Sequence, residues 1–359
     1  MAVDIGEALV PVQPRSRSKG GGLWRYVLIR LLLIIPTVLI LVSTVFFLMR
    51  ITGDPITAAL GGRLPADQLQ ERIHAAGYDR PLWQQYVEYL GAILRGDFGT
   101  TITDRRPVVE IILQYGSATL ELAIYALLVA LIISIPLGLV AAYRRDRWHD
   151  AVLRVMAILA YATPIFFAGL LLKLIFAVWL GWLPVSGRGN TRTELLMAGL
   201  DTPTGIYLLD AIRLGNGPAI ADVLQHAILP AIALGLLTAG VFLRLIRTNV
   251  IGTLGQQYVT SGRSRGVSEY RLVTKHAYRP ALIPIITVMG LQIALLLAGA
   301  VLTETTFEWK GIGFMLAEYL KSRDFVAVQG IVVMIAVVVA VTNFIVDIIA
   351  AFIDPRVRY

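Results

Sequence analysis

Six long apolar runs dominate this chain and restrict what it can fold into. A helix that crosses the hydrocarbon core of a bilayer needs about 20 predominantly apolar residues. The runs that satisfy this length are Val27–Met49, Ala118–Ala142, Ala151–Leu180, Ile228–Ile246, Leu282–Leu302 and Val328–Phe352. With 57% hydrophobic and 16% charged residues, the composition excludes an ordinary soluble domain. We therefore expect an all-α polytopic membrane protein with six transmembrane helices.

Basic residues are distributed unevenly between the two sets of connections that such helices would have. The two tails, the connection after the second run and the connection after the fourth run, each taken with the adjoining ends of the runs, hold 18 Lys or Arg and six Asp or Glu. The remaining loops hold 13 Lys or Arg and, apart from Glu304, 15 Asp or Glu. Because cytoplasmic segments of membrane proteins are enriched in Lys and Arg, both termini are expected to be cytoplasmic.

The runs divide the chain into regions of different character. The expected regions are a disordered cytoplasmic tail (1–22), a first transmembrane helix (23–49), an extracytoplasmic loop domain (50–117), a five-helix core (118–353) containing a cytoplasmic loop (248–283), and a short cytoplasmic tail (354–359). The first run is too long for the apolar part of a secretory signal peptide, so it is expected to be retained. Within the loop domain, Pro65–Ala76 and Leu82–Leu94 are candidate short helices.

One cytoplasmic connection, Gln256–Pro284, is polar, basic and much longer than a simple turn. Apolar residues such as Val259 and Val267 recur at near-helical spacing, Gly266 separates two helical stretches, and Ser268 is placed to cap the second. Because connections are normally short, this length predicts a surface helix that contacts a soluble partner. The alternative is a solvated basic loop without a partner.

Several kinds of chemistry have no support in the sequence. There is no Cys, so the chain cannot build a thiolate metal site, and no phosphate-binding loop of the usual ATPase pattern is present. The four histidines are isolated, without metal-ligand spacing. Gly262–Gly266 matches a hydrolase pattern and Asp97-Phe98-Gly99 a kinase pattern, but neither has the required context.

Polar residues inside or beside the apolar runs are better candidates for function, because ionisable groups in a membrane normally face a cavity or a partner. The candidates are Glu121, Lys173, Gln292, Glu304 and Asp347. Glu121 and Glu304 lie near run ends, where a structural role is as reasonable as a functional one. These residues are therefore expected either to line a pathway or to support helix packing.

Many segments of the chain resemble the permease subunits of dipeptide, oligopeptide and nickel ABC importers. Tyr258–Pro284 is similar to the cytoplasmic "EAA" loop of that branch, with Thr260-Ser261-Gly262 at the E-A-A positions when Gly266 is aligned. The other similar segments are Tyr26–Leu32, Gly77–Leu82, Gln85-Tyr86, Gly96–Gly99, Thr119–Ala123, Thr163–Phe166, Leu183–Arg188, Glu304–Gly313, Arg323-Asp324, Gln329-Gly330 and Asp354–Arg356. Two positions depart from the pattern: Lys310 stands where proline is usual, and Lys173 adds a charge to a normally apolar span.

The resemblance implies a type I ABC importer permease fold and a set of partners. These are a homologous second permease, two cytoplasmic ABC ATPases and an extracytoplasmic substrate-binding protein, assembled in the lipid of a bacterial or archaeal cytoplasmic membrane. ATP and Mg would be bound by the ATPases, so this chain is expected to carry no catalytic residue, cofactor, metal or nucleic acid and not to be an enzyme itself. The implied ATPase-coupling residues are Tyr258, Thr260, Ser261, Gly262, Arg265, Gly266 and Ser268.

The implied function is therefore that of a permease subunit that imports di- or oligopeptides. Nickel chelates and glutathione-like molecules are alternative cargoes, because selection rests largely on the separate binding protein. Loops 50–117 and 303–327 are expected to meet that protein. The competing classes are a self-sufficient carrier or channel, for which paired broken helices or pore-facing charges would be diagnostic, and an intramembrane enzyme, for which a nucleophile and base would be needed.

Overall fold

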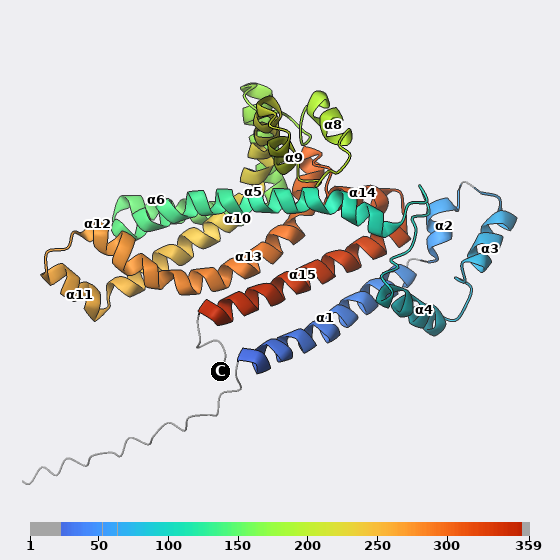
Figure 1. Ribbon diagram of the computed structural model, residues 1–359, viewed down its shortest axis with the longest axis horizontal. Helices are drawn as coiled ribbons and strands as arrows, with labels where there is room; N and C mark the ends of the chain where they lie inside the picture. Colours follow the sequence, from blue (N-terminus) through green and yellow to red (C-terminus); the bar gives the residue numbers. More distant parts are fainter. Residues whose placement is uncertain (1–22, 52, 63, 354–359) are drawn as a thin grey trace, which may run out of the picture.

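The computed structural model describes residues 23–51, 53–62 and 64–353, and this part of the chain is built from helices (Figure 1). Four of the described helices are each long and apolar enough to cross a membrane: α1 (Leu23–Ile51), α5 (Val108–Tyr143), α10 (Gly217–Leu254) and α15 (Phe325–Ile353). All four confirm apolar runs expected to be helical, and all extend beyond the predicted ends. The predicted tails 1–22 and 354–359 lie outside the described residues.

The third apolar run, Ala151–Leu180, is broken and does not form one continuous helix. Helix α6 (Trp148–Ala162) meets α7 (Ile165–Leu172) at 106°, and α7 continues into the wider π-helical turns of η1 (Lys173–Trp179). The break falls at Thr163 and Pro164, whose ψ angles of 124° and 134° are extended. A residue before proline avoids the helical region, and proline itself cannot donate the helical hydrogen bond.

The fifth run is also part of a bent pair. Helix α12 (Glu269–Arg271) continues through the π-helical η2 (Leu272–Ala277) into α13 (Tyr278–Phe307), with a bend of 53° close to Pro284. If each bent pair counts as one span, the described residues contain up to six spans. The expected number of six spans is therefore compatible with the structure. Without the two bent pairs, four helices have the length and composition of a span.

Short helices fill the connections between the long ones. They are α2 (Pro55–Leu60), α3 (Ala66–Ala75), α4 (Leu82–Leu94), α8 (Thr191–Ala198), α9 (Tyr207–Arg213), α11 (Gln257–Ser264) and α14 (Ile312–Lys321). The predicted helices of the first loop are confirmed as α3 and α4, whereas α2, α8, α9 and α14 were not anticipated. Helix α5 begins at Val108, so the boundary placed at residue 117 falls within a helix.

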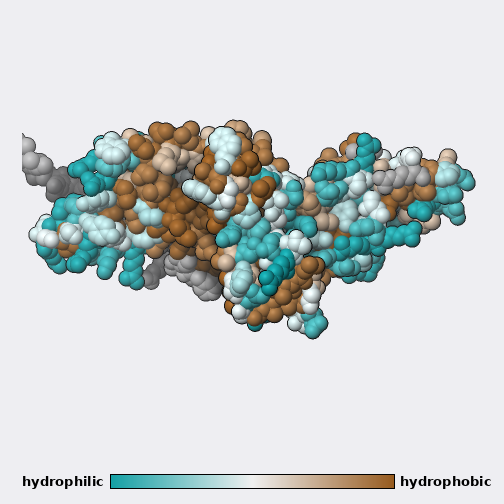
Figure 2. All heavy atoms as spheres, turned by 90° about the horizontal axis from the view of Figure 1, so that it is seen from above, coloured by the Kyte–Doolittle hydropathy of each residue, from teal (hydrophilic) through white to brown (hydrophobic). Residues whose placement is uncertain are grey.

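The long helices pack closely where small residues face their neighbours. A Cβ at Gly235 of α10 would lie 2.7 Å from the carbonyl oxygen of Ala126 in α5, and one at Gly138 of α5 would lie 2.8 Å from the Ile246 side chain. Small residues allow helix backbones to approach in this way. Hydrophobic side chains gather in a broad area between more hydrophilic ends of the molecule (Figure 2), as expected for a protein that crosses a bilayer.

Helices α1 and α15 run side by side in opposite directions (Figure 1). Arg30, near the start of α1, lies 3.1 Å from the carboxylate of Asp347, near the end of α15. The two ends of the described chain therefore lie at the same end of the helix bundle. Helix α11 lies at one end of the long axis and α2, α3 and α4 lie at the other (Figure 1).

Candidate functional site

The segment from α11 to the start of α12, residues 257–268, is named here the coupling surface. Val259 points inward and is fully buried. The exposed residues of α11 and its C-terminal turn are Gln257, Tyr258, Thr260, Ser261, Arg263, Ser264 and Arg265. One buried position against a row of polar and basic ones is the pattern of a helix lying on the protein with its outer face in water. The coupling surface is therefore available for contact with another molecule.

Gly266 forms the turn that ends α11. Its φ angle is +78°, and its N–H and that of Val267 donate to the carbonyl groups of Arg263 and Gly262 at 3.0 and 3.2 Å. A left-handed residue with such hydrogen bonds is the common glycine termination of a helix. Ser268 takes the extended N-cap conformation before α12, but its side chain makes no capping hydrogen bond. The predicted break is confirmed, and the predicted side-chain cap is not.

An ion pair joins α11 to α12 across this turn. Both Arg263 and Glu269 are about half exposed, and the Arg263 guanidinium donates two hydrogen bonds to the carboxylate, one of them with Nη2 and Oε2 at 3.1 Å. The neighbouring guanidinium lowers the pKa of Glu269 below the ordinary carboxyl value, so this carboxylate stays ionised at neutral pH. An exposed pair adds little stability, but its two-point geometry fixes the turn.

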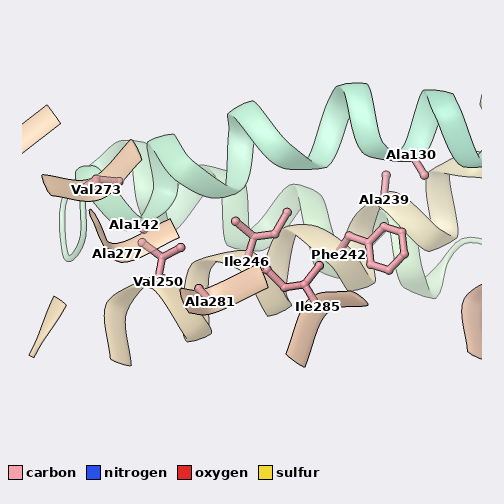
Figure 3. Close-up of a cluster of buried hydrophobic side chains, with 10 residues drawn as sticks. All are labelled: Ala130, Ala142, Ala239, Phe242, Ile246, Val250, Val273, Ala277, Ala281 and Ile285. Carbon is pink, nitrogen blue, oxygen red and sulfur yellow. The ribbon is translucent and has the colours of Figure 1, made fainter. Parts of the chain in front are cut away.

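The coupling surface is connected to the long helices by apolar packing. Leu272 and Val273 of η2 are buried, and a Cβ at Gly262 would lie 3.0 Å from the Leu272 side chain. Figure 3 shows the cluster that continues inward: Ala130, Ala142, Ala239, Phe242, Ile246, Val250, Val273, Ala277, Ala281 and Ile285. These residues come from α5, α10, η2 and α13. Because packed side chains resist compression, displacement of α11 would move these helices with it.

Glu121, one of the predicted polar candidates, is buried in a hydrogen-bonded network. Its carboxylate lies 2.5 Å from Nη2 of Arg188 and accepts hydrogen bonds from the Tyr125 hydroxyl at 2.8 Å and the Leu208 N–H at 2.9 Å. The Arg188 guanidinium also lies over the Tyr207 ring at 3.7 Å. Glu121 therefore fixes the loop before α8 and the start of α9 against α5.

Glu304 has a similar position at the end of α13. It accepts hydrogen bonds from the Thr119 hydroxyl at 2.6 Å and the Phe314 N–H at 2.8 Å. Neither Glu121 nor Glu304 reaches water, because their exposed fractions are 2% and 0%. We call these linked contacts of α5, α9, α13 and α14 the Glu121–Glu304 network.

The other predicted polar residues are placed at helix contacts. Lys173 donates a hydrogen bond to the carbonyl oxygen of Thr306 at 3.0 Å. Thr306 lies in the last turn of α13, and the C-terminal end of a helix attracts cations. Asp347 pairs with Arg30. Gln292 is buried, and its side-chain oxygen has no hydrogen-bond partner within the described residues. The structure does not gather these candidates into one site.

Asp150 and Asp324 are buried carboxylates that were not among the predicted candidates. Asp150 of α6 binds Arg247 of α10 through two hydrogen bonds of 2.5 and 2.7 Å. Asp324 accepts hydrogen bonds from the N–H groups of Ile102 and Thr103 at 2.7 and 2.8 Å. Asp324 belongs to the segment Arg323-Asp324, which resembles the importer permeases. That resemblance marked the residue but did not indicate which groups it would contact. No such signal marked Asp150 in the first turn of α6.

The described ranges contain no candidate metal centre. There, no group of three or more His, Asp or Glu side chains is arranged to hold an ion. The coupling surface is an exposed helix packed onto the long apolar helices. These features define a polytopic membrane protein with a polar helical surface at one end.

Comparison with known families identifies the class further. Residues 134–359 match the model of the binding-protein-dependent transport system inner membrane component, and residues 23–123 match the model of the N-terminal part of such membrane components. The chain belongs to this family. It is the membrane-embedded permease subunit of a binding-protein-dependent ABC importer and a multi-pass protein of the bacterial inner membrane.

Individual relatives extend over nearly the whole chain. It is 39% identical to the di/tripeptide transport system permease protein of Pseudomonas aeruginosa over 92% of this chain and 97% of the relative. It is 41% identical to the probable D,D-dipeptide transport system permease protein of Escherichia coli over 86% and 89% of the two chains. The glutathione transport system permease protein of Salmonella choleraesuis is 35% identical over 93% of this chain and 99% of the relative.

Proposed function

We propose that this chain imports di- or oligopeptides as one half of a paired permease, with two ATPases on the coupling surface side. The observation that carries the peptide assignment is the similarity to dipeptide permeases over more than nine tenths of the chain. An extracytoplasmic binding protein delivers the peptide to loops 50–117 and 303–327. Both termini and the coupling surface face the cytoplasm, and the two bent pairs each cross the membrane once.

The mechanism follows from the mechanical connection of the coupling surface. A partner ATPase holds α11 through its exposed face, which includes Tyr258, Ser261 and Arg265. When two ATPases close on ATP, α11 moves, and the cluster in Figure 3 transfers that movement to α5, α10 and α13. Rigid-body shifts of packed helices are a common means of switching access. The chain thus uses ATP hydrolysed by its partners and holds no ATP or Mg itself.

Gly266 provides the test of this mechanism. Its left-handed backbone disfavours other residues, most strongly β-branched ones, and a Cβ there would meet nothing within 4 Å. Gly266→Val should therefore distort the turn and reduce peptide uptake per ATP hydrolysed roughly tenfold, since about 1–2 kcal/mol of left-handed strain must be relieved. Gly266→Asn is the matched control, because asparagine tolerates this conformation.

Uptake of a labelled dipeptide and ATP hydrolysis are measured together in proteoliposomes that contain the complete importer. Normal coupling in Gly266→Val, or equal losses in both variants, would contradict the proposed role of the turn. Cargo is tested separately by competition of unlabelled dipeptides, oligopeptides and glutathione. Competition by glutathione but not by peptides would replace the peptide assignment and leave the coupling mechanism intact.

A further inference from the structure

A cavity of about 430 Å³ lies between α6 and α10. Its walls are mostly apolar, and three arginines lie along the same part of it. The lining residues are Arg154, Ala157, Ile158, Tyr161, Ala162, Gly240, Val241, Leu243, Arg244, Arg247 and Thr248. The helices come close together beside the cavity, because a Cβ at Gly240 would lie 2.7 Å from the carbonyl oxygen of Ala157. None of these residues belongs to the coupling surface.

The charges in the cavity do not balance. Arg247 is neutralised by two hydrogen bonds to Asp150, whose carboxylate also accepts the Asp146 N–H at 3.1 Å. Arg154 lies 3.9 Å from this same carboxylate, too far for a hydrogen bond. Arg244, which also lines the cavity, takes no part in an ion pair with a carboxylate of the described residues. Arg154 and Arg247 thus share the Asp150 carboxylate and Arg244 has none, so three positive charges face one negative charge.

The positions of the arginines give the cavity two chemically different ends. On α6, Arg154 precedes Ala162 by eight residues, which corresponds to about 12 Å along a helix. On α10, Arg244 and Arg247 lie toward the α11 end and Gly240 lies deeper. One end is therefore cationic and the other apolar. A small anion would use the first end alone, whereas an amphiphile with an anionic head would use both.

We propose that this cavity binds an anionic phospholipid of the inner leaflet, with its phosphate between Arg154 and Arg244. Guanidinium groups form strong, directional hydrogen bonds with phosphate oxygens. The acyl chains lie along the cavity wall and the neighbouring exposed face of α6, which includes Val155 and Leu159. The proposal rests on the proposed function only for the leaflet, because the coupling surface identifies the cytoplasmic end. It does not depend on the cargo.

The bound lipid would hold α6 and α10 together at the membrane surface. Asp150 and Arg247 already join these helices, and a phosphate that bridges Arg154 and Arg244 adds a second connection beside the first. Helix α10 contributes Phe242, Ile246 and Val250 to the cluster in Figure 3. A lipid bound in the cavity would therefore affect the packing of α10 against η2 and α13, which follow α11 in the chain. The site thus offers a means by which membrane composition affects the importer.

The test compares lipid retention by three forms of the full-length chain, purified with its partner subunits from bilayers of equal phosphatidylcholine and phosphatidylglycerol. The cavity variant is Arg154→Gln with Arg244→Gln. The control variant is Arg145→Gln with Arg147→Gln, which removes two exposed charges from the same end of the molecule without touching the cavity. Co-purified lipids are quantified by mass spectrometry after detergent extraction, and folding is checked by gel filtration.

The wild type and the control should retain phosphatidylglycerol preferentially. The cavity variant should lose that preference by about fivefold for each arginine removed, or roughly 25-fold in total, as basic groups close to anionic lipids contribute factors of this size. The single variants Arg154→Gln and Arg244→Gln should fall between these limits, which also keeps the test decisive if the double variant fails to fold. Equal retention by the cavity variant and wild type would overturn the proposal.

Two further measurements distinguish other sources of the anion. In phosphatidylcholine alone, titration with inorganic phosphate should give no saturable binding that depends on Arg154 and Arg244; such binding would show that the cavity takes a free anion. Addition of a dipeptide should leave retained phosphatidylglycerol unchanged. Displacement of the lipid by the dipeptide would assign the cavity to the transport pathway and overturn the lipid proposal.

Discussion

At the scale of single residues, contacts between distant parts of the chain explain three of the segments that resemble the family: Gly96–Gly99, Arg323-Asp324 and Gln329-Gly330. Gly99 lies against the start of α15, and Gly330 of α15 lies against the turn that contains Gly99. A Cβ at Gly99 would lie 2.9 Å from the Val326 side chain, and one at Gly330 would lie 2.9 Å from the Phe98 carbonyl oxygen. Asp324 fastens the same turn by its hydrogen bonds to Ile102 and Thr103. These residues therefore hold the loop before α5 against the start of α15.

Gly313 should be sensitive to the smallest substitution. A Cβ there would lie 2.5 Å from Cα of Val301 and 3.0 Å from a carboxylate oxygen of Glu304. Since backbone cannot move aside as easily as a flexible side chain, Gly313→Ala should lower the free energy of unfolding by about 1–3 kcal/mol. Gly252→Ala is the control, because nothing lies within 4 Å of its Cβ position and alanine is the better helix former. Thermal unfolding of the purified chain measures both, and equal stability of the two variants would contradict this packing.

The Glu121–Arg188 pair should show the cost of an uncompensated buried charge. The side chains are 1% and 7% exposed, so Glu121→Gln leaves the guanidinium without its counter-charge and should destabilise the chain by about 3–5 kcal/mol. The double variant Glu121→Gln with Arg188→Met should lose less than Glu121→Gln alone, because no buried charge remains. Chemical denaturation of the three forms provides the comparison. A double variant less stable than the single one would refute this interpretation of the pair.

At the scale of elements, the broken helices are as important as the long ones. The bend between α6 and α7 follows from the Thr163-Pro164 pair, and the bend near Pro284 separates η2 from the main part of α13. The second bend lets η2 lie beneath α11 while α13 continues among the other spans. The connection from the coupling surface to the bundle thus depends on an interruption of regular helix.

Leu272 is the contact through which α11 rests on η2. It is fully buried, so Leu272→Ala should remove about 2–5 kcal/mol of local packing and loosen α11 without unfolding the spans. Hydrogen exchange should accelerate in residues 257–264, and peptide uptake per ATP hydrolysed should fall. Leu195→Ala in α8, where the residue is 68% exposed, is the control. Unchanged exchange in α11 would show that Leu272 does not hold it.

At the scale of the whole molecule, α7 carries a row of exposed apolar side chains. Phe166, Phe167, Leu170 and Leu171 of α7 are all exposed, although α7 is turned by 106° from α6. Contiguous exposed apolar surface marks a site of contact with lipid or with another protein. This surface suits the second permease of the proposed assembly.

The purified chain alone should therefore not transport. In liposomes it should give no saturable dipeptide uptake above empty vesicles, whereas the complex with a second permease, two ATPases and the binding protein should give ATP-dependent uptake. The complex that carries Leu195→Ala serves as a control for handling, since this exposed side chain of α8 lies outside the coupling surface and outside both loops assigned to the binding protein. Uptake by the chain alone would favour the competing class, a self-sufficient carrier.

The sequence by itself determined the helical class, the approximate spans and the break at Gly266. These features depend on apolar run length and on local backbone preferences, both of which act between near neighbours in the chain. It also identified Glu121, Lys173, Glu304 and Asp347 as unusual, because a charge in an apolar run is costly wherever the chain folds.

Only the tertiary structure decided what those charges do. Arg188 meets Glu121 across 67 positions of the chain, and Arg247 meets Asp150 across 97, so their pairing depends on how the helices pack and has no local signature. The same packing produces the cavity beside Arg154 and Arg244 and the route from Val273 to Phe242. Short-range preferences specify helices and their ends, whereas charge pairing and cavities arise when distant helices are brought together.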